Sequence, residues 1–120
     1  METEAPLPDS VAAAQAFSAL GSEPRLEVVR ALVRAGPDGL PVGALQQTLG
    51  LAASTLSHHL RFLSAAGLLT QERQGRSLIC RASFDRIDAL AEFLRRECCV
   101  DAPAGHAPAT ASPPAQETRT

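Results

Sequence analysis

The stretch that decides the fold runs from Leu51 to Ser77 and reads LAASTLSHHLRFLSAAGLLTQERQGRS. Three leucines in it, Leu56, Leu60 and Leu63, recur at helical spacing, which places them on one face of a helix. Gly67 follows where a C′ glycine would end that helix. The stretch therefore predicts a helix with one buried face that stops at Gly67.

A second face of the same helix is polar. Ser54, His58 and Arg61 recur with the same spacing, and Thr55 and Ser57 widen the face they form. None of the five is a good core residue, and several donate hydrogen bonds. Such a face suits the base edges in the major groove of DNA. An ordinary amphipathic helix with a solvated face, packed beside a hairpin, would show the same pattern.

A short hairpin is expected directly after this helix. Residues 68–72 and 77–81 read as strands on either side of a tight turn at Gln74-Gly75-Arg76. Arg73 and Arg76 bring positive charge to its tip, within reach of phosphate or the minor groove. A polar-faced helix followed at once by a basic hairpin suits DNA.

Charge is distributed unevenly along the chain. The 120 residues suffice for one domain with a modest core, and the net charge of −2 argues against a generally basic nucleic-acid binder. Residues 51–82, however, hold four arginines (Arg61, Arg73, Arg76 and Arg81) against Glu72, a net +3. Residues 1–50 hold three arginines against six acids, and residues 83–120 hold four against six. The local positive patch can provide a phosphate footprint, which dimerisation would double.

Two helices are expected before the central stretch. The first is capped by Asp9 or Ser10 and runs to about residue 20. The second is capped by Ser22, with Pro24 in its first turn, where the missing N–H costs nothing. The side chains expected to face inward are Val11, Ala14, Phe17 and Leu20 from the first helix and Leu26, Val29, Leu32 and Val33 from the second.

A short third helix, residues 42–49, opens after Pro41 and ends at Gly50, with Leu45 and Leu49 facing inward. Because only a very short turn separates it from the next helix, the pair predicts a helix-turn-helix, with the hairpin as its wing. Asp85 is expected to cap a fifth helix. The apolar residues of that helix are Ile87, Leu90, Ala91 and Leu94, with Phe84 and Phe93 beside them.

The predicted fold is therefore mainly α (α+β): four helices, a two-stranded wing and a last helix. The broad apolar face of the last helix is expected to pair with a second copy; the alternative is that it packs only on its own domain. Residues 1–8 and the Ala-, Pro-, Thr- and Ser-rich residues 101–120 are expected to be disordered, on either side of one domain at 9–100. With no signal peptide and no membrane-spanning run, we expect a cytoplasmic protein with reduced thiols and no membrane partner.

The runs ALGSEPRLEVVRALVRAG (residues 19–36) and STLSHHLRFLSAAGLLTQERQGR (residues 54–76) resemble the ArsR/SmtB family of winged-helix repressors. The resemblance covers roughly residues 10–98; one departure is Ala52, where the family often has a capping serine. It implies a homodimer that binds inverted-repeat operator DNA and releases it when a ligand binds. The DNA contacts it implies are Ser54, Thr55, Ser57 and His58 for bases, Arg61 for phosphate, and Arg76 at the wing tip with Arg73 as its helper. His59 is expected to lie beside the core and not on DNA.

The resemblance also reduces the number of candidate ligands. Residues 42–49 lack the cysteine pair of one known sensor site, and the last helix lacks the histidine of another. What remains is Cys98-Cys99 at the end of the last helix, which looks like the arsenic-responsive branch with a vicinal cysteine pair. The expected inducer is therefore a trivalent arsenical, arsenite or methylarsenite, with antimonite as a further candidate.

The chemistry of the pair can be argued from the residues. Soft thiolates select thiophilic ions. Adjacent side chains on an ideal helix point about 100° apart, so chelation needs the helix end to unwind, and residues 100–103 are a place where it would fray. Two thiolates complete the shell of methylarsenite, whose third ligand is carbon. Arsenite needs a third sulfur or keeps a hydroxide.

Cys80 is the candidate third ligand, reached from the partner subunit; the alternative is a small buried apolar residue. Arg95 and Arg96 favour thiolates at the pair, while Glu97 and Asp101 oppose them, which leaves the sign of the pKa shift open. Competing readings are two incidental cysteines, a thiol redox sensor, and a winged helix that binds protein. Because no histidine lies near Cys98 to serve as a base, we expect no enzyme and no catalytic residues.

Overall fold

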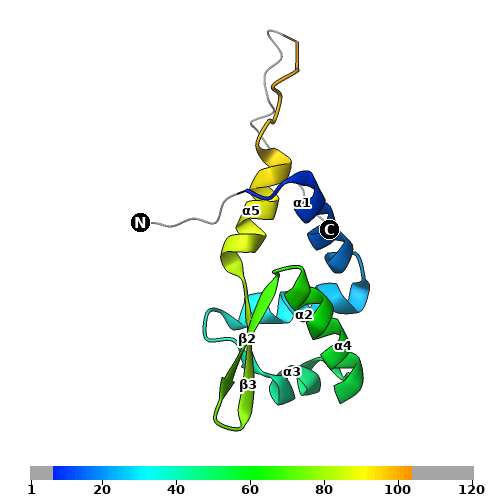
Figure 1. The fold of residues 1–120 in the computed structure, drawn as a ribbon, viewed down its shortest axis with the longest axis vertical. Helices are drawn as coiled ribbons and strands as arrows, with labels where there is room; N and C mark the ends of the chain where they lie inside the picture. The colour runs from blue at the N-terminus through cyan, green and yellow to red at the C-terminus, as the bar shows by residue number, and fades with distance from the viewer. Residues whose placement is uncertain (1–6, 104–120) are drawn as a thin grey trace, which may run out of the picture.

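A computed structural model describes residues 7–103, and most of the two segments predicted to be disordered lies outside that range. The elements are α1 Ser10–Leu20, α2 Glu23–Ala35, β1 Leu40–Pro41, α3 Val42–Leu49, α4 Ala53–Ala65, β2 Leu69–Gln74, β3 Ser77–Ala82 and α5 Phe84–Arg95. Figure 1 shows α3, α4 and the hairpin at one end of the molecule and α1 and α5 at the other. The predicted winged helix-turn-helix order is confirmed.

The helix-turn-helix is built from α3 and α4. Gly50 ends α3 in the left-handed conformation, with φ of 67°, and only three residues, 50–52, separate the helices. Gly67 ends the next helix as predicted. It lies at C′ with φ of 77°, and Leu68 N–H donates to the carbonyl of Leu63 at 2.9 Å, the bond that defines a Schellman motif. The direction of the chain is therefore fixed at both ends of the turn and at the start of the wing.

The sheet has three antiparallel strands in the order β1-β3-β2. The hairpin turns at Gly75, whose φ is 62°. The two-residue strand β1 was not predicted; it pairs Leu40 with Cys80 on the inner side of the wing. This approach requires glycine at position 39, because a Cβ there would overlap the carbonyl oxygen of Cys80. The wing is thus held on both sides of β3.

The core lies between α1, α2, α3, α4 and the base of the sheet. Leu56, Leu60 and Leu63 are buried as predicted. On the first two helices the predicted inward faces were partly wrong. Val11, Ala14, Leu26 and Val33 are exposed, whereas Val29 and Leu32 are buried as predicted. The other buried residues of these helices are Ala13, Ala16, Ala19, Val28 and Ala31. Helix α1 lays its alanines on the domain, so close packing against small side chains decided its rotation.

Helix α5 starts earlier than predicted, with Ser83 and not Asp85 at the N-cap. The reason is a tertiary bond: Ser83 N–H donates to the carbonyl of Leu68 at 3.0 Å, which fixes the backbone where the helix begins. One turn later the Arg86 guanidinium lies against Gly67 at the end of α4. These two contacts join the base of α5 to the end of α4.

Candidate nucleic-acid interface and thiol site

The polar face predicted for α4 is exposed in the structure. All five of its residues, Ser54, Thr55, Ser57, His58 and Arg61, are solvent-accessible, while the leucines of the opposite face are buried. The helix is therefore anchored on one side and presents hydroxyl, imidazole and guanidinium groups on the other. These groups can donate to base edges or phosphate.

Of the four arginines in the positive segment, one is used internally. Arg81 Nη1 lies 2.6 Å from Glu72 Oε1 across the hairpin, and its Nε donates to the carbonyl of Pro37 at 3.2 Å. Arg61, Arg73 and Arg76 make no ion pair with any carboxylate of residues 7–103. The cations left over by these pairings are the three predicted to contact DNA.

The strand register separates the two faces of the wing. Gln71 is opposite Cys80 and Arg73 is opposite Leu78, so these four side chains share the face turned toward the domain. Glu72 and its partner Arg81 belong to the other face. The wing thus turns the amide of Gln71 toward α4, and Arg73 follows on the same face of β2.

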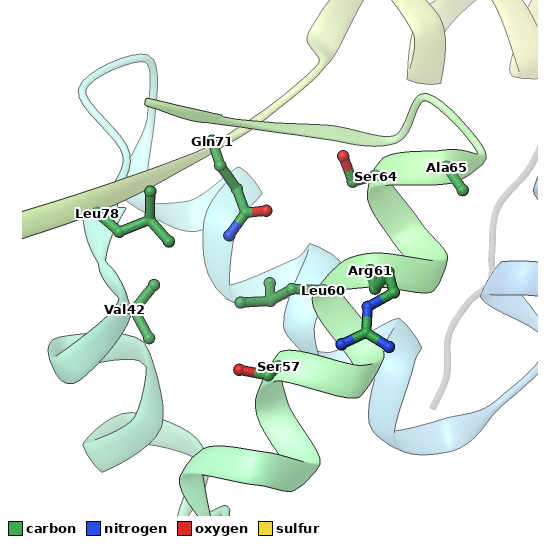
Figure 2. A pocket seen from close by; sticks show the side chains of 8 residues that line it. All are labelled: Val42, Ser57, Leu60, Arg61, Ser64, Ala65, Gln71 and Leu78. Carbon is green, nitrogen blue, oxygen red and sulfur yellow. The ribbon is translucent and has the colours of Figure 1, made fainter. Parts of the chain in front are cut away.

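A cleft separates this face of the wing from α4, and we call it the α4–wing cleft. Its volume is about 470 Å³. Its lining residues, shown in Figure 2, are Val42, Ser57, Leu60, Arg61, Ser64, Ala65, Gln71 and Leu78. The floor is apolar and the rim carries hydrogen-bond donors, although the sequence pattern had singled out only Ser57 and Arg61.

A cation–aromatic cluster that the sequence reading missed supports the back of α4. The Arg25 guanidinium carbon stands 4.7 Å from the Phe62 ring centroid, and His58 meets the same ring edge-on at 5.1 Å. His59 is half-buried, with Nδ1 shielded from solvent and lacking a hydrogen-bond partner among the described residues. Burial, and then the charges of Arg25 and His58, lower the pKa of His59. This placement is that of a neutral residue beside the core.

The cysteine pair lies just beyond α5, which ends at Arg95. The chain continues in turns, with Cys98 N–H donating to Arg95 at 2.9 Å, and Cys99 has a φ of 66°. This unwinding brings the two exposed sulfurs to 3.4 Å from each other. The hydrogen bond with Cys98, followed by that neighbour's charge, raises the pKa of Cys99.

A second cleft, of about 600 Å³, lies beside Cys98. Its walls come from the start of α1 and the end of α5, namely Leu7, Pro8, Asp9, Ser10, Phe93, Leu94, Arg96, Glu97 and Cys98. The two helices are therefore neighbours at this end of the molecule. One thiol of the pair opens directly onto a partly apolar surface.

Cys80 lies elsewhere, fully buried on β3 within the core. Burial raises its pKa, although a weak 3.9 Å contact from Gln71 Nε2 opposes that effect. Residues 7–103 contain no cluster of three His, Cys, Asp or Glu side chains able to hold a metal ion. Within one chain, then, the structure does not bring Cys80 to the pair.

Comparison with known proteins supports this arrangement. A family model described as a helix-turn-helix domain matches residues 20–72. The transcriptional regulator NmtR of Mycobacterium tuberculosis is 45% identical over 78 residues, 62% of each chain. The putative arsenical resistance operon repressor ArsR2 of Halobacterium salinarum is 38% identical over 61 residues, 51% of this chain and 50% of that protein. The chain thus spans between half and two thirds of the length of these two relatives.

The transcriptional activator HlyU of Vibrio cholerae is matched over more of its length, at 30% identity across 76% of this chain and 82% of HlyU. Its solved structure superposes with a TM-score of 0.61, covering 76% of this chain and 96% of that one. None of the helices between residues 7 and 103 combines the length and apolarity that crossing a bilayer requires. With this architecture and these relatives, the chain belongs to the ArsR/SmtB family of winged helix-turn-helix regulators.

Proposed function

We propose that this chain is a homodimeric transcriptional repressor that binds operator DNA and releases it when a trivalent arsenical binds Cys98 and Cys99. The observation that carries the sensing half is the 3.4 Å separation of two exposed sulfurs at the end of α5. The DNA-binding half rests on the exposed polar face of α4, the cations of the wing and family membership.

DNA binding follows from the shape of the domain. Helix α4 projects its polar face away from the core, and Arg73 and Arg76 stand on the wing beside it. In the winged-helix arrangement such a helix enters the major groove, with the wing over the neighbouring backbone and minor groove. One domain covers only a half-site, so a two-fold operator calls for two copies.

Pairing of two copies is supported by apolar side chains left exposed at the α1–α5 end. Val11 and Leu94 are each 68% exposed, and Val100 is 67% exposed. Figure 1 shows α1 and α5 at the end of the molecule opposite the wing. A second copy packed there would bury these residues and leave both α4 helices free for successive major grooves, about 34 Å apart.

The sulfur spacing fits chelation of a pyramidal ion. Two sulfurs each about 2.3 Å from one ion, the length of a zinc–thiolate bond, are about 3.3 Å apart when the angle at the ion is close to a right angle. Each thiol displaces one hydroxide of methylarsenite, and its proton leaves with that hydroxide as water. The arsenic keeps its oxidation state, so the reaction needs no oxidant or reductant.

The number of sulfurs favours methylarsenite as the tightest ligand. Two sulfurs and one carbon complete the three-ligand shell of methylarsenite, and the cleft beside Cys98 offers Phe93 and Leu94 to the methyl group. Arsenite and antimonite would keep a hydroxide or recruit a third sulfur, with Cys80 of another copy as the candidate. The buried position of Cys80 makes that recruitment costly.

Release of DNA requires the ligand to favour one of two states. Chelation constrains the turn after α5, next to the surface proposed for pairing, and so changes how two copies meet. A hundredfold loss of operator affinity corresponds to about 2.7 kcal/mol of coupling. The bonds formed at one two-sulfur site can supply that difference.

The test is titration of the reduced protein, bound to its own promoter fragment, with methylarsenite and separately with arsenite. We expect methylarsenite to release the DNA from the wild-type chain and not from the C98S/C99S variant, which still binds the promoter. A C80S variant is the matched control and should respond like the wild type. Release from the C98S/C99S variant would place the site elsewhere.

A thiol redox switch is the second candidate, because two exposed thiols so close together are also open to oxidation. A solved structure of HlyU, 28% identical, is described as the reduced form of that protein. Here peroxide would take two electrons and two protons from thiols of two copies, forming an intersubunit disulfide and two waters. DNA release by peroxide with no arsenical present, reversed by dithiothreitol, would favour this function.

A further inference from the structure

We infer that the α4–wing cleft holds the sugar-phosphate backbone of DNA, with Gln71 and Ser64 as phosphate-binding residues beside Arg61. This inference rests on the proposed DNA binding and assigns two contacts that the sequence pattern did not indicate. Gln71 comes from β2, and Ser64 from the last turn of α4.

The geometry of the double helix determines which part of the DNA lies in the α4–wing cleft. When α4 lies in the major groove and the wing reaches the adjacent minor groove, the strand that separates those grooves runs between them. The α4–wing cleft occupies that position, with α4 on one side and the inner face of the wing on the other (Figure 2). The groups lining it therefore face backbone and not base edges.

The rim of the cleft carries donors, which suits phosphate because phosphate oxygens only accept. Figure 2 shows the Gln71 side chain extending from the strand toward α4, and the Ser64 hydroxyl pointing from the helix toward the strand. Both residues are exposed. Among the described residues, the amide of Gln71 contacts only the Cys80 sulfur, at a long 3.9 Å. The Gln71 amide can therefore rotate to donate to a phosphate, because the only hydrogen bond it gives up among the described residues is this weak one.

The apolar floor and the positive charge of the cleft are both compatible with a sugar-phosphate backbone. Val42, Leu60 and Leu78 form an apolar surface of the kind that deoxyribose can contact. No carboxylate belongs to the lining, and Arg61 supplies a positive charge. Arg73 follows Gln71 on the same face of β2, so the donors continue toward the wing tip as a track along one strand of DNA.

Gln74 provides a matched control for Gln71. It has the same side chain on the same strand and is also exposed, but it lies on the opposite face and does not line the cleft. We expect Q71A to weaken binding by roughly tenfold, the usual worth of a hydrogen bond to a charged group, and Q74A to stay within about twofold. The measurement is fluorescence anisotropy on a duplex selected from a random pool and on an unselected duplex.

The pattern of the losses separates phosphate from base contacts. A phosphate contact is sequence-independent, so Q71A and S64A should weaken both duplexes by the same factor. Neither residue is charged, so the slope of log affinity against log salt should stay unchanged, whereas R61A should reduce that slope by about 0.9. Equal affinities of Q71A and Q74A, or a Q71A loss confined to the selected duplex, would overturn the assignment.

A second measurement locates the contact on DNA. Methylphosphonates placed one at a time in the selected duplex remove single phosphate charges. At the contacted phosphate, the substitution should weaken the wild type and cost Q71A several-fold less. Additive losses at every position would overturn the assignment even if Q71A alone were weak. A wild-type chain that binds neither duplex would refute the proposed function itself, and the inference with it.

Discussion

The two ends of the molecule are built in opposite ways. At the wing end, three buried leucines and glycine-terminated turns hold α4 in place, and β3 is paired with a strand on each side. At the cysteine end, α5 has its last buried residue at Leu90, and from Glu97 to Asp101 every residue is exposed. The exposed polar face of α4 is therefore held in a fixed shape, while the thiol site is supported by a few hydrogen bonds of the turns after α5. A surface that must match DNA needs rigidity, and one that must respond to a ligand needs freedom to rearrange.

The largest effect should come from removing a leucine at the rigid end. Leu56 is fully buried in α4, so L56A should lower the free energy of unfolding by about 2–5 kcal/mol. The C98S/C99S variant should stay within about 0.5 kcal/mol of the wild type, because both thiols are exposed. Urea denaturation of both variants measures the difference. Equal losses would contradict the contrast between the two ends.

A smaller effect is expected where β1 braces the wing. Gly36 and Gly39 both have positive φ, but only at Gly39 would a Cβ meet the backbone of β3. Alanine at either position costs about 1–3 kcal/mol of backbone strain, and G39A should add about 1–3 kcal/mol of overpacking. Thermal unfolding of the two variants compares them directly. A G39A variant no less stable than G36A would mean that β1 does not brace the wing.

The pH dependence of thiol reactivity tests the structure of the cysteine end. Because Cys98 raises the pKa of Cys99, alkylation of Cys99 by iodoacetamide should reach half of its maximal rate at a higher pH than for an ordinary exposed cysteine. In a C98S variant the charge of the neighbouring thiolate disappears, and the midpoint should move down. Mass spectrometry of the modified peptide gives the rate at each pH. An unchanged midpoint in C98S would show that the two sulfurs do not interact in solution.

The smallest effect concerns His59 behind α4. Its pKa is lowered in the folded chain, so the unfolded chain binds the proton more tightly. Stability should therefore be complete above about pH 6.5 and should fall as the pH drops from that value through the folded pKa. An H59Q variant should lose less stability than the wild type between pH 7 and 5. H58Q removes only the smallest of the three causes of the His59 shift, so it should lose nearly as much stability as the wild type.

Much of the wing end could be predicted because it depends on local chemistry. The leucine spacing of α4, the C′ glycine at position 67 and the glycine turn of the wing each act within a few residues. Helix α3 has the bounds that were predicted, residues 42–49. Local rules of this kind can be read from one sequence.

Features that depend on distant partners could not be predicted. Strand β1 exists because Leu40 meets Cys80, forty residues further along the chain. The rotation of α1 depends on what its alanines pack against, and an Ala-rich helix offers almost no pattern to indicate that side. The start of α5 at Ser83 depends on a hydrogen bond to Leu68.

For the candidate site, the sequence indicated the polar face of α4 and the cysteine pair but not how their side chains are arranged. The exposed polar face of α4 and the need for unwinding at the cysteines followed from helical geometry. The sulfur separation depends on the positive φ of Cys99, which a non-glycine residue rarely adopts. Gln71 and Ser64 carry no motif and become visible only when the wing and α4 face each other across the cleft.

The joint at the base of α5 has a mechanical consequence. Ser83 is hydrogen-bonded to Leu68, and the Arg86 guanidinium packs against Gly67, so the start of α5 is fixed to the end of α4. The 12 residues of α5 extend about 18 Å from that contact. The helix can therefore act as a lever that pivots next to the end of α4. Tilting such a lever by about 10° sweeps its tip by about 3 Å. If a ligand shifts the thiols by a few ångströms, as the proposed function requires, the same geometry changes the angle that α4 presents to DNA.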